Sequence, residues 1–345
     1  MMKKVCILSI DGGGIRGILP GVILSCIEER LRLKAGDEVR LSDYFDLVAG
    51  TSTGGILTCL YLTPNEDRRP KFEAKDAVDL YFKNGGEIFS MPFYRKILNP
   101  FGLFESKYPA TNIEKVLKKY FNNTALNELL KPCIVTAYDF STRRTYFFNQ
   151  KDPQKGEDRN FLVRDIARAT SAAPTYFPPV EIHSFANKKL CLIDGGVFAG
   201  NPAMCAYAEA RTSVYNKGET ASSKPDFPTA ADLLVVSLGT GLRENAYSYR
   251  KARRWGLPGW LRPIIDILMS GSSETVHYQM KQLFNAASGN DGFYFRLEPQ
   301  LGDANSSLDD ASEKNMNALK RAGEQFVREN SDLLDRIVDL LIENK

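Results

Sequence analysis

The sequence predicts an α/β fold with a mainly parallel central sheet. Two segments near the N-terminus each combine an apolar strand, a glycine-containing turn and an apolar helix. The first runs from Val5 through the glycines after Asp11 into a helix over Ile15 to Leu33, and the second is centred on Ser52. Such units in succession are typical of layered α/β proteins, in which helices join and cover parallel strands.

The length of the chain fits one large or two modest globular domains, and the spread of its candidate motifs from residue 11 to residue 196 favours one. With 345 residues, 43% hydrophobic and 25% charged, the chain can bury a large core. A formal charge of +3, from 45 basic and 42 acidic residues, gives no field that would indicate nucleic-acid binding. We expect a single domain over residues 1–345, with a motif-bearing core at 5–215 and with 216–345 completing the sheet and supplying a lid and C-terminal helices.

Cysteine usage and hydropathy limit the cellular setting. The six cysteines are scattered and the two histidines are isolated, so neither a disulfide frame nor a metal site is expected. Asp11 and its glycines interrupt the first apolar segment too early for a signal peptide, and no run approaches the ~18 apolar residues of a membrane span. We expect a cytoplasmic protein that contacts lipid transiently and peripherally.

The remaining elements are predicted from apolar periodicity and from their Gly and Pro boundaries. Helices are expected over 74–83, 112–121, 161–170, 202–215, 272–284 and, as one or two, 312–341; strands are expected over 133–138, 144–148, 190–193, 233–238 and 293–297.

Ser52 is the candidate nucleophile. It lies in Gly50-Thr51-Ser52-Thr53-Gly54, between an apolar strand and an apolar helix. This strand-turn-helix context lifts a serine hydroxyl clear of a sheet edge. The flanking glycines leave no Cβ to obstruct the turn or an approaching ester.

The loop Asp11-Gly12-Gly13-Gly14-Ile15-Arg16-Gly17 follows a strand and opens a helix, so its backbone amides converge on one point. Such a nest suits a phosphate or an oxyanion. Gly12, Gly14 and Gly17 also satisfy G-x-G-x-x-G, which makes a nucleotide-binding Rossmann module an alternative. That module needs an acidic residue at the end of the second strand, where this sequence has Ala49 to Ser52.

Two groups could act as the base for Ser52. The order Ser52, Asp194, His277 would suit the triad of an α/β-hydrolase esterase, and His183 is the other histidine of the chain. Asp194 could also act alone, because it ends an apolar strand before two glycines and a buried carboxylate can accept a serine proton. The residues themselves leave both assignments open.

Four blocks together resemble the patatin-like phospholipases, including bacterial members. They are Asp11-Gly-Gly-Gly-x-Arg16-Gly17, Gly50-x-Ser52-x-Gly54, Ala169-Thr170-Ser171-Ala172-Ala173-Pro174 and Asp194-Gly195-Gly196. The resemblance implies a three-layer α/β/α fold and a lipid acyl hydrolase of phospholipase A type, which cleaves membrane glycerolipids through an acyl-serine and needs no cofactor.

The resemblance also implies a role for each residue at a matching position. Ser52 would be the nucleophile and Asp194 the base, and the amides of Gly12, Gly13 and Gly14 would form the oxyanion hole. Arg16 would order the loop or contact a lipid phosphate. A regulatory activator or a homo-oligomer is compatible with the resemblance, and the apolar stripe at the C-terminus suits either association or core packing.

Arg253 to Arg262 brings both tryptophans of the chain, Trp255 and Trp260, among basic residues. Interfacial membrane anchors often have this composition. An aromatic cluster that packs a lid onto the body would have it too. Membrane contact by the two tryptophans is therefore one of two predictions for this segment.

Overall fold

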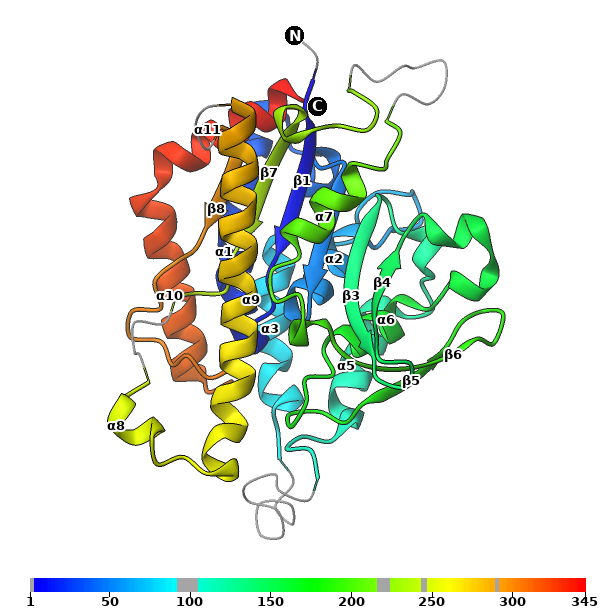
Figure 1. Cartoon of the computed structure of the whole chain (residues 1–345). Coiled ribbons are helices and arrows are strands. Elements are labelled where there is room, and N and C mark those ends of the chain that lie inside the picture. The colour runs from blue at the N-terminus through cyan, green and yellow to red at the C-terminus, as the bar shows by residue number, and fades with distance from the viewer. Residues whose placement is uncertain (1–2, 92–104, 216–223, 243–246, 289–291) are drawn as a thin grey trace.

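The computed structural model describes residues 3–91, 105–215, 224–242, 247–288 and 292–345, and Figure 1 shows the chain. The described strands form one eight-stranded sheet in the order β5-β6-β3-β2-β1-β7-β8, with β4 paired to β3. The strands are β1 (Val5–Ile10), β2 (Leu47–Thr51), β3 (Cys133–Asp139), β4 (Arg144–Asn149), β5 (Val180–His183), β6 (Lys189–Asp194), β7 (Leu233–Leu238) and β8 (Tyr294–Leu297).

The centre of the sheet is parallel and one side is antiparallel. β3, β2, β1, β7 and β8 pair in parallel, whereas β4 and β6 run antiparallel to β3 and β5 runs antiparallel to β6. Parallel strands need helices on both faces to bury their side chains. The fold therefore has to be layered.

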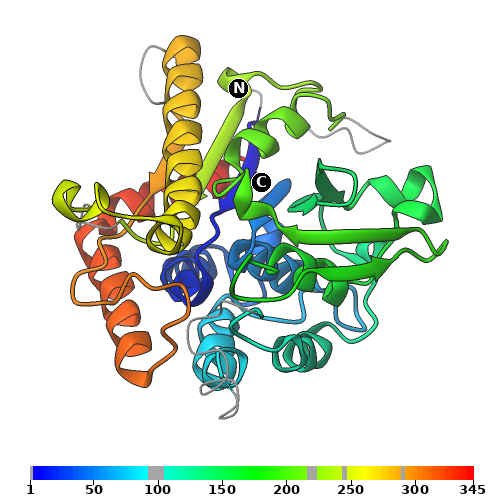
Figure 2. The same ribbon diagram turned by 60° about the horizontal axis from the view of Figure 1, so that its bottom comes forward.

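Helices cover both faces of the sheet, as Figure 2 shows from the end where the parallel strands finish. Alternate residues of β1 point to opposite faces, Cys6 and Leu8 into the larger apolar core and Val5 and Ile7 into the smaller one. On the larger core lie α1 (Ile18–Ala35), α2 (Thr53–Leu62), α3 (Lys75–Ile88), α5 (Ala110–Phe121), α6 (Val163–Thr170), α10 (Glu313–Glu329) and α11 (Ser331–Glu343); on the smaller lie α7 (Ala203–Ala210) and α9 (Leu257–Ser288).

The predicted three-layer α/β/α architecture with a mainly parallel sheet is confirmed. The short helix α8 (Tyr249–Ala252) precedes α9, and the 3₁₀ turns are η1 (Gly14–Gly17), η2 (Leu41–Asp43), η3 (Leu126–Glu128), η4 (Asp152–Lys155), η5 (Glu157–Arg159), η6 (Gly195–Val197) and η7 (Ala230–Asp232). No helix in the described ranges is long and apolar enough to cross a bilayer.

One helix is much longer than predicted. A helix was expected over 272–284, but α9 has 32 residues and continues through Pro263. Proline within a helix leaves the carbonyl four residues earlier without its usual donor. That carbonyl belongs to Gly259, an exposed residue in the first turn of α9, where water can replace the missing bond.

The edge of β3 brings two distant turns together. β4 fills one edge of β3 along residues 134–139, so the opposite edge is shared by β2, along 133–136, and β6, along 137–139. β2 is parallel to β3 and β6 is antiparallel, so their last residues, Thr51 and Asp194, meet end to end. The turns that follow these two strands consequently occupy the same place at the edge of the sheet.

Candidate active site

Ser52 occupies a strained, buried turn between β2 and α2. Its φ of 54° and ψ of −121° lie where non-glycine residues are rare. A Cβ on Gly50 would lie 2.2 Å from the carbonyl oxygen of Gly54, and a Cβ on Gly54 would lie 2.1 Å from that of Ile10. Both flanking glycines are therefore required by close backbone approach, as the motif predicted.

Thr170 anchors this turn from α6. The backbone N–H of Ser52 donates to Thr170 Oγ1 at 2.8 Å. Two residues later, the carbonyl of Ala172 accepts the backbone N–H of Asp194 at 3.0 Å. The segment between α6 and Pro174 therefore fixes the backbone on both sides of the site.

The side chains of Ser52 and Asp194 are in direct contact. Ser52 Oγ donates a 2.6 Å hydrogen bond to Asp194 Oδ2, while the amide of Gly196 donates to Oδ1 at 2.7 Å. Only 6% of Ser52 and 2% of Asp194 is exposed. Burial raises the pKa of Asp194 from 3.8 to about 7, although the bonds from Ser52 and Gly196 oppose the rise. The carboxylate is thus basic enough to take a proton near neutral pH.

The glycine loop lies against Ser52. A Cβ on Gly12 would be 3.3 Å from Ser52 Cβ, and one on Gly13 would be 2.3 Å from Thr240 Oγ1. Gly14 has a φ of 59°, and a Cβ there would be 2.1 Å from the carbonyl oxygen of Leu308. The loop is therefore closely enclosed by residues from distant parts of the chain.

The amides of the loop differ in what they contact. The N–H of Gly12 donates to the carbonyl of Gly200 at 2.9 Å, and the N–H of Ile15 donates to that of Leu308 at 2.8 Å. Within the described residues, the amides of Gly13 and Gly14 have no acceptor. Of the three amides predicted to form the oxyanion hole, that of Gly12 is thus already bonded within the protein.

A buried ion pair between Asp11 and Arg296 holds the glycine loop in place. Arg296 on β8 donates to both carboxylate oxygens of Asp11, at 3.0 and 2.7 Å, and also bonds Glu298. Ser273 on α9 donates to Asp11 at 2.8 Å. Bidentate contacts of this kind fix orientation as well as charge. The loop is therefore held by the C-terminal third of the chain.

Arg16 faces this polar side rather than the apolar side of the loop. It lines a pocket of about 360 Å³ together with Asp11, Arg296 and Glu298, and its Nε donates a long 3.4 Å bond to the carbonyl of Gly13. Burial raises the pKa of Glu298, and the positive charges of Arg296 and Arg16 oppose that rise, so the charge of Arg16 is partly balanced by protein carboxylates. Of its two predicted roles, this placement favours ordering the loop.

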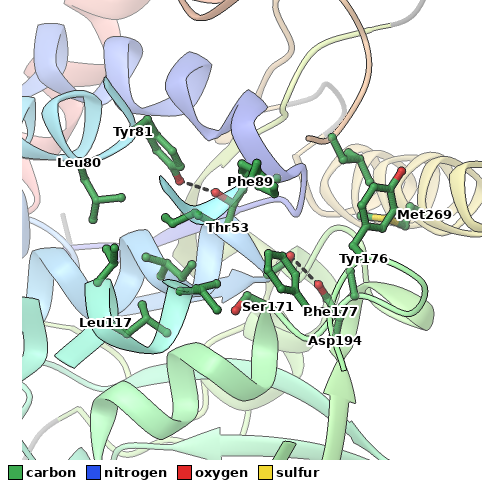
Figure 3. Close-up of a pocket in the computed structure, with 18 residues that line it drawn as sticks. Thr53, Leu80, Tyr81, Phe89, Leu117, Ser171, Tyr176, Phe177, Asp194 and Met269 are labelled. Atoms are coloured by element: carbon green, nitrogen blue, oxygen red, sulfur yellow. Dashed lines mark hydrogen bonds between the residues drawn. The ribbon is translucent and has the colours of Figure 1, made fainter. Parts of the chain in front are cut away.

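An apolar cavity opens beside the Ser52–Asp194 pair. In Figure 3, Met269 and Tyr176 lie on the Asp194 side of this cavity, and Leu80 and Leu117 lie at the opposite side. Its volume is about 60 Å³, so it is a narrow slot rather than a wide pocket. The side chains along its length come from α2, α3 and α5, and they include Ile56, Leu80, Ile88, Ile113, Val116 and Leu117.

Neither histidine lies between the serine and the aspartate, because these two bond directly. His277 Nδ1 is 3.2 Å from Tyr294 Oη on β8, and His183 is an exposed residue of β5 near Glu181. The described residues hold no group of three metal-ligating side chains. In the described site, the hydroxyl of Ser52 therefore has Asp194, and not a histidine, as its hydrogen-bond partner.

Comparison with known proteins decides the family. The sequence model of the patatin-like phospholipases matches residues 8–207, which include the glycine loop, Ser52 and Asp194. The chain belongs to the patatin-like phospholipase family. The predicted family is thus confirmed, and membership supports a lipid acyl hydrolase over a nucleotide-binding module.

Relatives extend the similarity to nearly the whole chain. Patatin-like protein 1 of Arabidopsis thaliana is 36% identical over 94% of this chain and 81% of its own. Patatin-like protein 2 of Oryza sativa is 33% identical, over 97% and 86%. Among solved structures, VipD from Legionella pneumophila matches 95% of this chain and 67% of its own, with 11% identity and a TM-score of 0.41.

One relative carries a name that describes it as inactive. A Solanum tuberosum protein named probable inactive patatin-3-Kuras 1 is 32% identical over 94% of this patatin-like chain and 87% of its own. Similarity across the chain can therefore be shared with a protein whose name denies activity.

Several contacts in this patatin-like site had no assigned role in the sequence. Thr170 lies in a block that marked the family, but its bond to the Ser52 amide follows only from the fold. Arg296 and Met269 lie in the region that carries no motif, and both reach the site from distant elements. A lone arginine in a short strand gives no sequence signal.

Proposed function

We propose that this patatin-like chain is a lipid acyl hydrolase of phospholipase A type with a Ser52–Asp194 dyad. The observation that carries the proposal is the direct 2.6 Å bond between Ser52 Oγ and a buried carboxylate whose pKa is raised to about 7. A strained turn holds the hydroxyl at that carboxylate, as an activated nucleophile requires.

In the first half-reaction, Asp194 takes the hydroxyl proton while Ser52 Oγ bonds to the ester carbonyl carbon. Negative charge moves to the carbonyl oxygen, where the free amides of Gly13 and Gly14 donate to it. When the tetrahedral intermediate collapses, the bond between carbon and the alcohol oxygen breaks. Asp194 returns its proton to that oxygen, which leaves as a lysolipid and leaves an acyl-serine behind.

In the second half-reaction, a water molecule replaces the alcohol. Asp194 accepts a proton from the water as the water oxygen bonds to the acyl carbon, and the same two amides stabilise the oxyanion. Collapse breaks the bond to Ser52 Oγ and returns the proton to that oxygen. A fatty acid is released and the dyad is restored.

The apolar slot is the proposed acyl site. Its lining from α2, α3 and α5 begins at Ser52 and Asp194, so an acyl chain bound along it would place its carbonyl at the hydroxyl. A volume of about 60 Å³ admits the first carbons of a chain, and longer chains require the lining side chains to rotate. The free state of all six cysteines supports a reducing, cytoplasmic setting.

Fluorophosphonate labelling tests this proposal. The probe phosphonylates an activated serine, so peptide mass spectrometry should find the adduct on Ser52 in the native chain and none in Ser52→Ala. Ser171→Ala is the matched control, because Ser171 lines the same cavity but its Oγ bonds back to the carbonyl of Ala167 at 2.7 Å. An adduct on a serine other than Ser52, or hydrolysis by Ser52→Ala, would refute the dyad.

A further inference from the structure

Exposed apolar side chains gather around α8 and α9. Of the thirteen exposed large hydrophobic residues in the described ranges, eight lie between residues 242 and 278. They are Leu242, Tyr247, Tyr249, Trp260, Ile264, Ile267, Leu268 and Tyr278. Water-exposed apolar side chains at this density mark an interaction surface.

Four of these residues form one row on α9. Trp260, Ile264, Ile267 and Leu268 follow helical spacing and are each 40% to 50% exposed. We call this set the α9 row. Helices that lie on a membrane surface present such a row, because their apolar face enters the lipid.

Aromatic contacts order the start of the α9 row. The half-buried Trp255 ring lies 5.1 Å from the Trp260 ring and 5.4 Å from that of Tyr247, in near-perpendicular geometry. Tyr247 also donates to Asp266 on α9 at 2.7 Å. The predicted roles of the two tryptophans therefore separate, with Trp255 packing α8 against α9 and Trp260 reaching the surface.

The same segment is strongly basic. From Tyr247 to the end of the α9 row at Leu268, the segment has five basic residues and one acidic residue, Asp266, in a chain whose net charge is +3. Arg250, Lys251, Arg253 and Arg254 are exposed in the segment that directly precedes α9. Anionic lipid headgroups attract clustered cations at about 1 kcal/mol each. Charge complementarity thus selects a negatively charged bilayer as the occupant.

The α9 row leads directly to the site. Met269, the residue after Leu268, lines the acyl slot. Three residues further along α9, the hydroxyl oxygen of Ser272 accepts a 3.2 Å hydrogen bond from the Gly200 amide. Residues 257–268 precede this level and extend about 18 Å along the helix axis at 1.5 Å per residue. Figure 1 shows α8 and these turns beyond the finishing ends of β1 and β7.

We infer that the α9 row and the cations of α8 form a docking surface for bilayers that contain anionic phospholipids. The inference rests on the proposed function in one respect, since a docked bilayer would present its acyl esters to the slot beside Met269. Docking itself needs only the exposed row and the charges.

The two tryptophans make the experiment site-specific, because the chain contains no others. Ser52→Ala removes turnover, and Trp255→Phe in addition leaves Trp260 as the sole emitter. Its fluorescence should shift to the blue, and brominated acyl chains should quench it, with vesicles of phosphatidylcholine and phosphatidylserine. Phosphatidylcholine alone, or ~1 M salt with its Debye length of about 3 Å, should abolish both effects.

Matched variants distinguish binding through this surface from nonspecific binding to vesicles. Vesicle affinity should fall about 10- to 30-fold in Arg253→Gln/Arg254→Gln, and stay within about twofold in Lys118→Gln/Lys119→Gln, another exposed neighbouring pair. Leu268→Ser should weaken binding about tenfold, whereas Leu33→Ser, at the most exposed leucine of the described chain, should not.

Two results would overturn the inference. One is a Trp260 emission that phosphatidylserine vesicles leave unchanged, and the other is a self-association that Leu268→Ser abolishes, which would assign the row to a second copy of the chain. Binding is measured without turnover, so its outcome is independent of Ser52 labelling. Docking without labelling would refute only the proposed chemistry, and labelling without docking would refute only this surface.

Discussion

Ser52 donates its hydroxyl proton toward Asp194 across 142 positions of the chain, in a 2.6 Å hydrogen bond. The contact exists because β2 and β6 approach each other head to head along one edge of β3. Ser52 directly follows the last residue of β2, and Asp194 is the last residue of β6. The pair is therefore set by sheet topology, and its chemistry can be tested by changing the carboxylate, the loop and the slot separately.

The pH dependence of hydrolysis should report Asp194. Its pKa is raised to about 7, and the base acts only when deprotonated. We expect kcat/KM for a soluble short-chain ester to rise about tenfold per pH unit below pH 7 and to level off above it. Initial rates between pH 5 and about 9 measure this midpoint. A profile already flat from pH 5 would contradict a buried, raised carboxylate.

Asp194→Asn should abolish hydrolysis and raise the free energy of unfolding at pH 8. In the folded protein the raised pKa favours the neutral acid, so ionisation destabilises the native state as pH rises from 3.8 through about 7. We expect the variant to be inactive and, at pH 8, to have a free energy of unfolding roughly 2–4 kcal/mol higher than that of the native chain. Unfolding at pH 8 and pH 5 checks this, since the free-energy difference should fall by more than half at pH 5 and vanish only below the ordinary pKa of 3.8.

Gly13→Ala should disable the loop without disturbing the dyad. The added Cβ would lie 2.3 Å from Thr240 Oγ1, so the loop must move and the Gly13 amide with it. Loss of one oxyanion donor costs about 10²-fold or more in kcat. The control is Gly86→Ala in α3, where a Cβ meets nothing within 4 Å and alanine should stabilise the helix by about 1 kcal/mol. Equal rates in the two variants would remove the loop from the mechanism.

Val116→Phe should shorten the acyl chains that are accepted. Val116 lines the slot from α5, and a larger ring there fills space that a long chain would enter. We expect hydrolysis of a dodecanoyl ester to fall at least about tenfold more than that of a butanoyl ester, together with an overpacking cost of about 1–3 kcal/mol. Rates on both esters give the ratio. Parallel losses on the two would indicate misfolding rather than a filled slot.

Local sequence was sufficient for the fold class and for the two turns of the dyad. Both turns depend on residues that are close together in the sequence. The glycines around Ser52 permit its tight turn after β2, and the apolar run before Asp194 forms the strand that ends there. The family was predicted from these motifs and is confirmed. The proton-transfer role of the pair stays a prediction.

Nonlocal contacts could not be predicted in the same way. The Gly12 amide is taken by Gly200, and the Asp11 carboxylate is bound by Arg296, through pairings set by the whole sheet. The helix expected over 272–284 likewise proved shorter than α9, because the sequence does not show that the carbonyl left unbonded by Pro263 is exposed to water. Tertiary context decided each of these points.

The supports of the glycine loop have a consequence for truncated forms of the protein. Thr240, Arg296 and Leu308 all lie beyond residue 207, where the family match ends. A fragment cut there would retain both partners of the dyad and yet lose the buttress that shapes the anion cradle. The segment that the family model matches thus lacks the residues that enclose the glycine loop, so we expect cleavage after residue 207 to distort this loop although it lies far from Ser52.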